Sequence, residues 1–351
     1  MCQDVGSPGD LLAGAPRPAG GSAVDPIELA PVDEVSVTTL VDNTFDALLV
    51  STEGVTRPPF GIGQVTAPQF APGRTPAGLV AEHGFSALVS VRRGDARTTT
   101  LLFDTGVSPE GMASNAERLG LALDDLQAVV LSHGHFDHAG GFPGLARLRR
   151  RRGLPITVHP AVWTRRRIAV PGLPAVELPT LSPAALAAEG FEVIERRHPS
   201  LLLEGCVLVT GEVDRTTEYE RGMPASHQAW GGDAWRHDPT VVDDQALVVH
   251  LRGRGLVVVT GCGHAGVVNI ARHAMRLTGV DRLAALVGGF HLGGPAFEPS
   301  IGPTVAALTE MAPDLLVPGH CSGWRAQHAL AAALPGAWVQ SSSGTTYRLA
   351  A

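Results

Sequence analysis

The chain has 351 residues, of which 44% are hydrophobic and 17% charged, so it can bury a substantial core as a soluble globular protein. Its formal net charge of −7 excludes a broad nucleic-acid-binding surface, and the arginine cluster at 147–153 is short enough to be a solvated helix end. Four scattered cysteines provide no disulfide framework, the first residues show no signal-peptide pattern, and no apolar run approaches the roughly 20 residues of a membrane span. We therefore expect a cytoplasmic protein that contacts neither nucleic acid nor membrane.

Breaker-rich and periodic segments alternate along the first half. Residues 1–33 are rich in proline, glycine and alanine and predict a flexible leader, followed by a single domain over 34–351. The segment 57–78 is rich in glycine and proline and is expected to be a long loop. Apolar runs and capping residues predict strands at 35–43, 85–93, 98–106 and 126–132, and helices over 108–120 and 141–152.

The second half has the same mixture of elements. Strands are predicted at 155–160, 191–197, 201–211, 245–253, 255–261, 283–290 and 314–320, and helices over 265–279, 300–312 and 324–336. Strands and helices mix in both halves, which favours an α/β protein with two mixed sheets covered by helices over a simple βαβ ladder.

A cluster of ionisable residues ends the predicted strand at 126–132. The stretch LSHGHFDHAGG places His133, His135, Asp137 and His138 within six positions. A buried strand does not normally end in ionisable side chains unless something neutralises them. Imidazole nitrogen and carboxylate oxygen together suit zinc, iron(II) or manganese. In an extended segment the first two histidines can point to one side while the last two residues face a second point, so one strand end can serve two adjacent ions.

Three later histidines occur in the same sequence context. His264, His291 and His320 each follow an apolar run and a glycine turn. Glycine lets the backbone approach a crowded centre because it has no Cβ. Together with the first cluster, these residues predict further groups of the same metal centre.

The cluster stands in a motif of a known family. The pattern H-x-H-x-D-H after a strand resembles the signature of the metallo-β-lactamase fold superfamily of binuclear metal hydrolases. Further stretches resemble the branch named for 7,8-dihydropterin-6-methyl-4-(β-D-ribofuranosyl)-aminobenzene-5′-phosphate synthase. They occur in the same order over about residues 35–325: LVDNT (40–44), LVAEHGFSALV (79–89), LLFDTG (101–106), EGCVLVTGE (204–212), DDQALVV (243–249), GCGHAGVVNI (261–270), GGFHL (288–292) and PGHCSG (318–323).

The resemblance implies a four-layer αββα sandwich, the metallo-β-lactamase fold, with two divalent ions at one edge between the sheets. Zn²⁺ is the expected metal, although the ligand set also suits Fe²⁺ or Mn²⁺. Asp104, in LLFDTG, matches the family's aspartate that orients the histidine loop, a task that metal-binding histidines require of a neighbour. The implied ligands form one pair on the first ion, one pair on the second and two later residues: His133 and His135, Asp137 and His138, and His264 and His320.

At four positions the resemblance does not determine the role of the residue. Many binuclear members carry a bridging aspartate where Cys262 stands, and this cysteine is either a thiolate ligand or a small buried residue beside the site. The branch usually has serine at the position of Gly263. His291 is expected to be an acid–base group or a substrate contact more than a ligand, and Cys321 is expected to pack.

The segment between the histidine cluster and His264 is expected to form the substrate pocket, as an insertion at about 160–240. Its loop-like part at 212–240 is rich in aromatic and cationic side chains, and Arg215, Trp230 and Trp235 are the candidate pocket residues. Aromatic rings beside arginines suit a flat ring that carries an anionic group, so we expect an aromatic, anionic small-molecule substrate. The alternative is a surface loop with incidental aromatic residues.

Two adjacent divalent ions lower the pKa of a bridging water toward about 7 and polarise the group under attack, so no serine or cysteine nucleophile is required. The leading prediction is a metal-dependent hydrolase of a small ester, lactone, amide or phosphate. In it Asp137 binds a metal and orients the water, while His291 protonates a leaving group or stabilises a developing anion. Two alternatives stay open: a transferase that joins a dihydropterin methyl diphosphate to an arylamine ribofuranosyl phosphate, and a non-catalytic protein that binds metal or senses a ligand.

Overall fold

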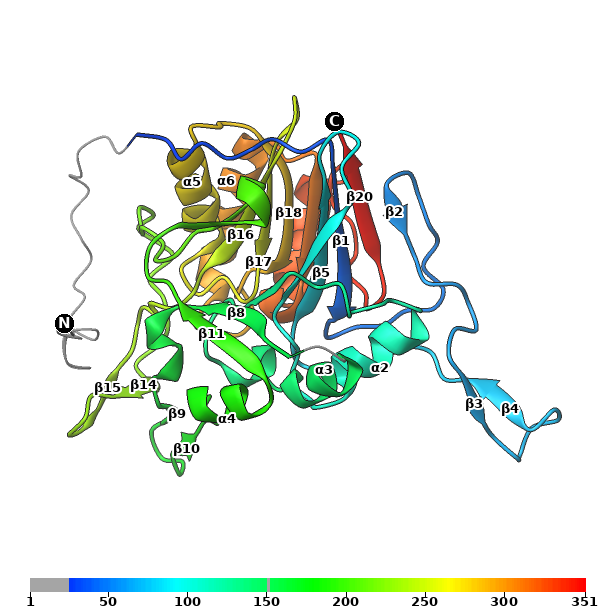
Figure 1. The fold of residues 1–351 in the computed structure, drawn as a ribbon. Helices are drawn as coiled ribbons and strands as arrows, with labels where there is room; N and C mark the ends of the chain where they lie inside the picture. The colour runs from blue at the N-terminus through cyan, green and yellow to red at the C-terminus, as the bar shows by residue number, and fades with distance from the viewer. Residues whose placement is uncertain (1–24, 150–151) are drawn as a thin grey trace.

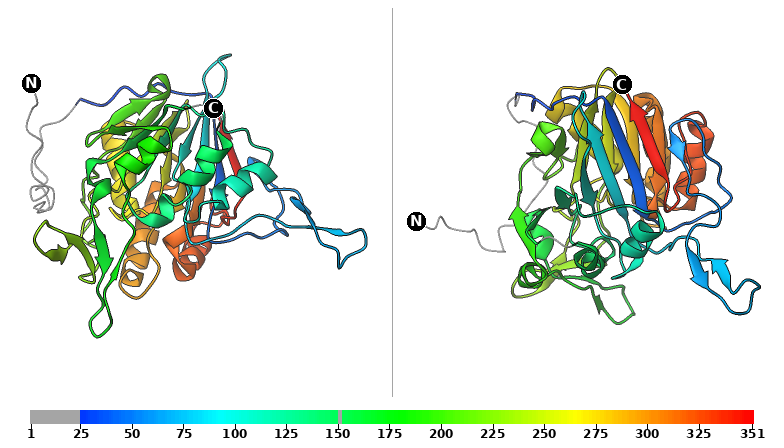
Figure 2. Two further views of the ribbon diagram at one scale, coloured as in Figure 1. Left: turned by 60° about the horizontal axis from the view of Figure 1, so that its bottom comes forward. Right: turned by 45° about the vertical axis from the view of Figure 1, so that its right-hand side comes forward.

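Two mixed β-sheets lie face to face in the computed structural model, which describes residues 25–149 and 152–351 (Figure 1). The larger sheet has eight strands in the order β11 (Phe191–Glu195), β8 (Leu154–Val158), β7 (Ala128–Val130), β6 (Thr99–Phe103), β5 (Ser86–Arg92), β1 (Glu34–Val41), β20 (Thr346–Ala350) and β2 (Val55–Thr56). The smaller has six in the order β12 (Ser200–Leu202), β13 (Val207–Val209), β16 (Ala246–Leu251), β17 (Gly255–Thr260), β18 (Leu283–Gly289) and β19 (Leu315–Gly319). The right-hand view of Figure 2 shows β1 between β5 and β20.

Strand residues alternate between two separate hydrophobic cores. In β16, Leu247 and Val249 face the other sheet, whereas Ala246 and Val248 lie on the outer face. Both sets are fully buried, which requires a layer on each side of the sheet. A strand that is buried on both faces has a nearly continuous run of apolar residues. This explains why the predicted strands at 245–253 and 255–261 show no regular alternation of apolar and polar residues.

Helices cover both outer faces. α2 (Gly111–Arg118), α3 (Phe142–Leu148) and α4 (Pro183–Ala188) pack on the eight-stranded sheet. α5 (Val267–Thr278), α6 (Ile301–Met311) and α7 (Trp324–Ala333) pack on the six-stranded sheet. The order of layers is therefore helix, sheet, sheet, helix, and the predicted αββα sandwich is confirmed.

The carboxyl ends of two groups of parallel strands meet at one edge of the sandwich. In the larger sheet β6, β7, β8 and β11 run parallel, and in the smaller sheet β17, β18 and β19 do. Asp104 follows β6, the histidine cluster follows β7, and Cys262, His291 and His320 follow β17, β18 and β19 in turn. The topology thus gathers side chains from five strand ends in one place.

The segment predicted as an insertion at about 160–240 contributes to three sheets. β11 joins the larger sheet, and β12 and β13 join the smaller one. The remaining strands form a separate antiparallel sheet at the lower left of Figure 1, in the order β10 (Val176–Glu177), β9 (Arg166–Ile168), β14 (His227–Trp230) and β15 (Trp235–His237). We refer to these four strands as the insertion sheet.

Several local expectations differ from the structure. The segment 57–78 contains a hairpin of β3 (Gln64–Thr66) and β4 (Arg74–Pro76) instead of only a loop. The single strand expected at 201–211 is two strands, because Leu203 and Glu204 adopt left-handed backbone angles between them. β20 is not among the predicted strands. It pairs with β1 and β2, which lie far away in the sequence, so no local pattern marks it.

Most of the predicted leader, residues 1–24, lies outside the described residues. Residues 25–33 run along the body, where the Ile27 amide donates to the Leu277 carbonyl at 2.7 Å and the Val32 amide to that of His250 at 2.9 Å. Among the residues that the structure describes, every helix is too short or too polar to cross a lipid bilayer.

Candidate metal centre

The histidine cluster occupies a tight loop between β7 and the short 3₁₀ helix η1 (Phe136–His138). Gly134 stands between the first two histidines, and a Cβ at that position would lie 2.3 Å from the Val162 carbonyl oxygen. Only glycine fits this close approach of two backbones. The loop therefore turns with His133 and His135 directed toward the same point.

Three imidazoles converge as a first donor set, made of His133, His135 and His264. Nδ1 of His135 lies 3.0 Å from Nε2 of His133 and 3.1 Å from Nε2 of His264, and the two Nε2 atoms are 3.2 Å apart. All three residues are buried. Nitrogen ligands of one tetrahedral zinc lie about 3.3 Å apart, because each is about 2.0 Å from the metal. The spacing of the first donor set fits one such ion.

The proton of His133 lies on the outside of this set. Asp104 accepts from both the amide and the hydroxyl of Ser132, each at 2.7 Å. Since the Ser132 hydroxyl donates to the carboxylate, it accepts from Nδ1 of His133 at 2.9 Å. Nε2 of His133 is then the unprotonated atom. Its lone pair faces the other two rings, where a cation would attract it.

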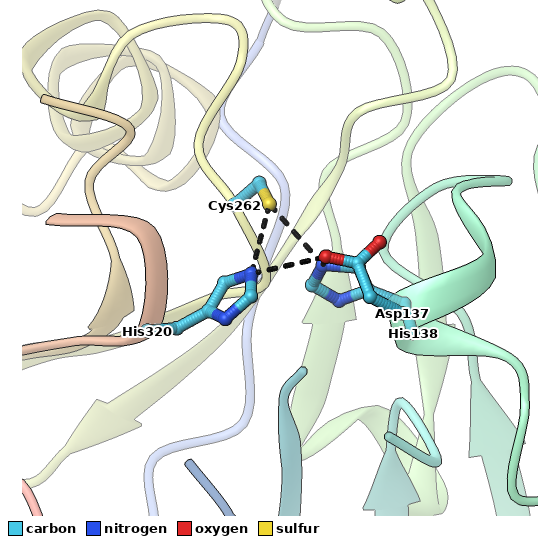
Figure 3. Close-up of side chains that lie close together, drawn as sticks. All are labelled: Asp137, His138, Cys262 and His320. Atoms are coloured by element: carbon cyan, nitrogen blue, oxygen red, sulfur yellow. Dashed lines mark hydrogen bonds and ion pairs between the residues drawn. The ribbon is translucent and has the colours of Figure 1, made fainter. Parts of the chain in front are cut away.

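Four further side chains form a second donor set, made of Asp137, His138, Cys262 and His320 (Figure 3). Sγ of Cys262 lies 3.2 Å from Nε2 of His138 and 3.3 Å from Nε2 of His320. Oδ2 of Asp137 is 3.7 Å and 3.5 Å from the same two nitrogens. One oxygen, two nitrogens and one sulfur around a common point match the ligand types and number of a tetrahedral zinc site.

Outer partners orient both histidines of the second donor set. Nδ1 of His138 lies 2.7 Å from Oδ2 of Asp104, and Nδ1 of His320 lies 3.0 Å from Oδ1 of Asn43. Both oxygens accept, so Nδ1 is protonated in each ring and Nε2 faces the site. Asp104 thus orients His138 directly and His133 through Ser132, and is the aspartate expected to brace the histidine loop.

Burial and charge act differently on the two sets. Desolvation holds the pKa of His133, His135 and His264 well below the ordinary value, so these rings are neutral. Burial also disfavours charge on His138, but the carboxylates of Asp137 and Asp104 outweigh it and raise its pKa to about 9. Burial would raise the pKa of Asp137, but His138 and His320 outweigh it and keep that pKa below its usual range.

Cys262 links the two sets. Besides its place in the second set, its Sγ lies within 4.8 Å of the donor atoms of His133 and His264. Desolvation raises the pKa of its thiol. The donors present fit two adjacent divalent ions, with one cation needed to stabilise the Cys262 thiolate.

His291 lies beside the donor sets and belongs to neither. Its ring centroid is 4.2 Å from that of His264, and within the described chain its buried Nδ1 has no hydrogen-bond partner. Cys321 donates its thiol to the Cys262 carbonyl at 3.3 Å. Gly263 has a φ of +72°, which disfavours the serine usual in this branch.

The three candidate pocket residues have different surroundings. Arg215 is half-buried, and its guanidinium donates to the carbonyl oxygens of His264, at 3.1 Å, and of Thr240. Trp230 and Trp235 pair across the insertion sheet with ring centroids 5.4 Å apart. The structure thus places Arg215 against the backbone of a candidate ligand and the tryptophans together on a partly exposed hairpin.

Four residues at the site were given no role from the sequence: Asn43, His83, Ser132 and His227. Asn43 and His83 lie in stretches that carry the family resemblance, which was a usable signal. Nε2 of the exposed His83 is 3.7 Å from Oδ2 of Asp137, and Nε2 of His227 is 3.0 Å from Nε2 of His135. Nothing local in the sequence marks His227.

Comparison with known proteins agrees with this geometry. The family model of the metallo-beta-lactamase superfamily matches residues 85–271, and the chain belongs to this superfamily. Two curated proteins of Methanocaldococcus jannaschii are similar to it. One, named 7,8-dihydropterin-6-methyl-4-(beta-D-ribofuranosyl)-aminobenzene-5′-phosphate synthase, is 26% identical over 251 residues, covering 70% of this chain and 83% of the relative. The other, an uncharacterized protein, is 26% identical over 250 residues, covering 70% and 86%.

A solved structure shares the fold. The crystal structure of a metal-dependent hydrolase of the beta-lactamase superfamily superposes with a TM-score of 0.65 at 23% sequence identity, covering 90% of this chain and 100% of that chain. The predicted family and branch resemblance are therefore confirmed, and the sandwich is that of the superfamily.

The two donor sets predict the metal content. We expect about two ions per chain, because six protein ligands plus bridging water, and Cys262 in addition, exceed what one tetrahedral ion requires. Elemental analysis of protein prepared without chelator, and again after reconstitution with Zn²⁺, measures this. A ratio that never rises above one ion per chain contradicts the two-set arrangement.

Asp104 should control metal affinity without binding metal. Asp104→Ala removes the acceptor for His138 and Ser132, and should weaken ion binding about 10- to 100-fold, as losses of orienting partners do. His138→Ala, which deletes a donor atom, should abolish the ion of the second donor set. Chelator competition measures both, with the exposed Asp125→Ala as control. Wild-type affinity in Asp104→Ala would show that the loop holds its histidines without this carboxylate.

Proposed function

We propose that this protein is a metal-dependent hydrolase that acts on a small-molecule ester, lactone, amide or phosphate. The supporting observation is the adjacency of two donor sets linked by Cys262, whose Sγ is within 4.8 Å of donors in both. Zn²⁺ is the proposed metal, since thiolate and imidazole favour it, with Fe²⁺ or Mn²⁺ as alternatives. A cytoplasmic setting belongs to the proposal, because reducing surroundings keep the Cys262 thiol free.

Two adjacent divalent ions, when bound, supply a water of lowered pKa and polarise the carbonyl or phosphoryl group under attack. Asp137 then orients the attacking water by accepting its proton in a hydrogen bond, a role supported by the low pKa of this carboxylate, whose Oδ2 lies 3.7 Å from Nε2 of the exposed His83. His291 protonates the leaving group, because its ring stands next to His264 with a nitrogen free of other partners among the described residues.

The proposed substrate is aromatic and anionic. Trp230 and Trp235 form a paired aromatic surface, and the guanidinium groups of Arg165 and Arg167 lie 4.7–5.6 Å from their ring centroids. Such a surface can stack with a flat ring and attract its negative charge. Arg215 enters the proposal as a cation beside His264, although its present hydrogen bonds go to backbone carbonyls.

A second candidate is a group transfer, favoured by the relative that is named as a synthase and is 26% identical. The nitrogen of an arylamine ribofuranosyl phosphate would attack the methylene carbon of a dihydropterin methyl diphosphate. The new C–N bond forms as the C–O bond breaks, diphosphate leaves with the electron pair, and the amine proton passes to a base such as His291. Divalent cations held by the donor sets would then neutralise the diphosphate.

One experiment separates these chemistries. Protein loaded with Zn²⁺ is incubated with a panel of esters, lactones, amides and phosphates in ¹⁸O-labelled water, and separately with the pterin diphosphate and arylamine pair. Hydrolysis places one ¹⁸O in the product, and transfer releases diphosphate only when the amine is present. Amine-dependent release without label uptake would replace the hydrolase proposal by the transferase. No turnover by fully loaded protein would leave the third candidate, a non-catalytic metal-binding or ligand-sensing protein.

The tryptophan pair should affect substrate choice and not the metal centre. Replacing Trp230 and Trp235 with alanine should lower kcat/KM for an aryl phosphate by about 2- to 10-fold per ring, the range of a lost aromatic contact. A small aliphatic ester should react at a nearly unchanged rate, with metal content and Tm preserved. Equal losses on both substrates, or loss of metal, would assign the hairpin to the structural support of the site.

A further inference from the structure

His135 is held by a residue of the insertion sheet. Its Nε2 lies 3.0 Å from Nε2 of His227, whose Nδ1 lies 3.0 Å from the carbonyl oxygen of Asp238. His227 and His135 are both buried, with 1% and 8% of their surface exposed. A carbonyl oxygen can only accept a hydrogen bond, so Nδ1 of His227 carries a proton.

This hydrogen bond determines which nitrogen of His135 can bind an ion. An imidazole that carries its single proton on Nδ1 has an unprotonated Nε2, so Nε2 of His227 is the acceptor in its contact with His135. Nε2 of His135 must therefore donate, which leaves the lone pair on Nδ1. That atom is the one 3.0 Å from His133 Nε2 and 3.1 Å from His264 Nε2.

A buried ion network fixes His227 and the histidine loop to the same support. Arg166 of β9 donates to Asp238 at 3.0 Å and to both carboxylate oxygens of Asp243. Asp243 also accepts from the Gly134 amide at 2.8 Å, between His133 and His135. Arg166 and Asp243 are 3% and 0% exposed, so neither charge has solvent as an alternative partner. Arg166 of the insertion sheet is thus linked to the backbone of this loop through Asp243, and His227 contacts His135 directly.

The other histidines with outer partners are oriented from elsewhere. His133 and His138 depend on Ser132 and Asp104 at the ends of β7 and β6, and His320 depends on Asn43 after β1. These partners belong to the larger sheet of the sandwich. His135 is the ligand whose partner comes from the insertion sheet, which also carries the tryptophan pair on β14 and β15.

We infer that the insertion sheet is a structural part of the metal centre, in which His227 is a positioning residue that selects Nδ1 of His135 as the donor atom and so sets the affinity of the first donor set. The inference rests on the proposed metal-dependent function. It has a reciprocal consequence: an ion in the first donor set should stabilise β9 and β14, because coupling between two equilibria is symmetric.

Binding of Co²⁺ tests the inference without any assay of activity. Wild type, His227→Ala and His227→Gln are titrated with Co²⁺ against a chelator. The chelator competition resolves two binding steps, the ligand-field bands report both ions, and the thiolate-to-cobalt charge-transfer absorption marks any ion that Cys262 binds. His227→Ala should weaken one binding step, that of the first donor set, about 10- to 100-fold while the other step keeps its wild-type affinity. His227→Gln should recover most of the loss, because its side-chain oxygen can accept from His135.

The matched control is His237→Ala, on the neighbouring strand β15, where the exposed imidazole donates to the Met223 carbonyl and reaches no ligand. Hydrogen exchange of peptides covering β9 and β14 is measured with and without Co²⁺. Metal-dependent protection that is present in wild type and His237→Ala but lost in His227→Ala supports the inference.

Two results would overturn it: wild-type affinity at both donor sets in His227→Ala, or equal loss in the alanine and glutamine variants, which would indicate a packing role. Failure of wild type itself to bind Co²⁺ would overturn the proposed metal-dependent function instead.

Discussion

The site depends on one electrostatic constraint: buried donor atoms face one another, and their protons are held on the outside. In the first donor set three imidazole nitrogens lie within 3.2 Å of each other, and hydrogen-bond partners outside the set leave His133 and His135 with inward lone pairs. Such an arrangement is repulsive in a low-dielectric interior unless positive charge lies between the atoms. The strand ends, the turn glycines and the orienting partners all serve to hold this arrangement in place, and a divalent ion is the group that relieves it.

Backbone conformation shows how firmly the strand ends are held. Asp104, His291 and His320 have φ values of +59°, +43° and +46°, in the left-handed region that costs a residue with a Cβ about 1–3 kcal/mol. Such angles persist where neighbours determine them. Asp104 is fixed by His138 and Ser132, and the His320 amide donates to Asp42 at 3.2 Å. The free energy of packing the sandwich therefore supports a preformed donor geometry at its edge, so little reorganisation is needed when an ion binds.

Much of this fold could be predicted from the sequence, because its core strands are continuous apolar runs and a helix such as α5 ends at a glycine, Gly279, which adopts a left-handed conformation. The histidine cluster could also be recognised in the sequence, because its ionisable residues interrupt an apolar run. β20 and the contact of His227 with His135 could not be predicted, because both depend on pairings between distant segments. Ninety-two positions separate the two histidines, and only the register of β14 against β9 brings them together. Local sequence patterns therefore identify the donor residues well. They are a poor guide to the residues that orient those donors.

The two proposed chemistries make the same demand on the donor sets and different demands on the insertion sheet. Either reaction needs two cations next to a phosphoryl or carbonyl group. The ligands at the strand ends can hold these cations whichever nucleophile attacks. The choice between water and an arylamine would be made by the surface that admits, orients or excludes the second reactant, a role that the proposed function gives to Trp230 and Trp235. Because the same sheet also holds His135 through His227, changes that adapt the hairpin to a new substrate remain constrained by the register that keeps His135 oriented. Substrate specificity can then vary most freely at the outer end of the hairpin, beyond His227, where no donor atom depends on it.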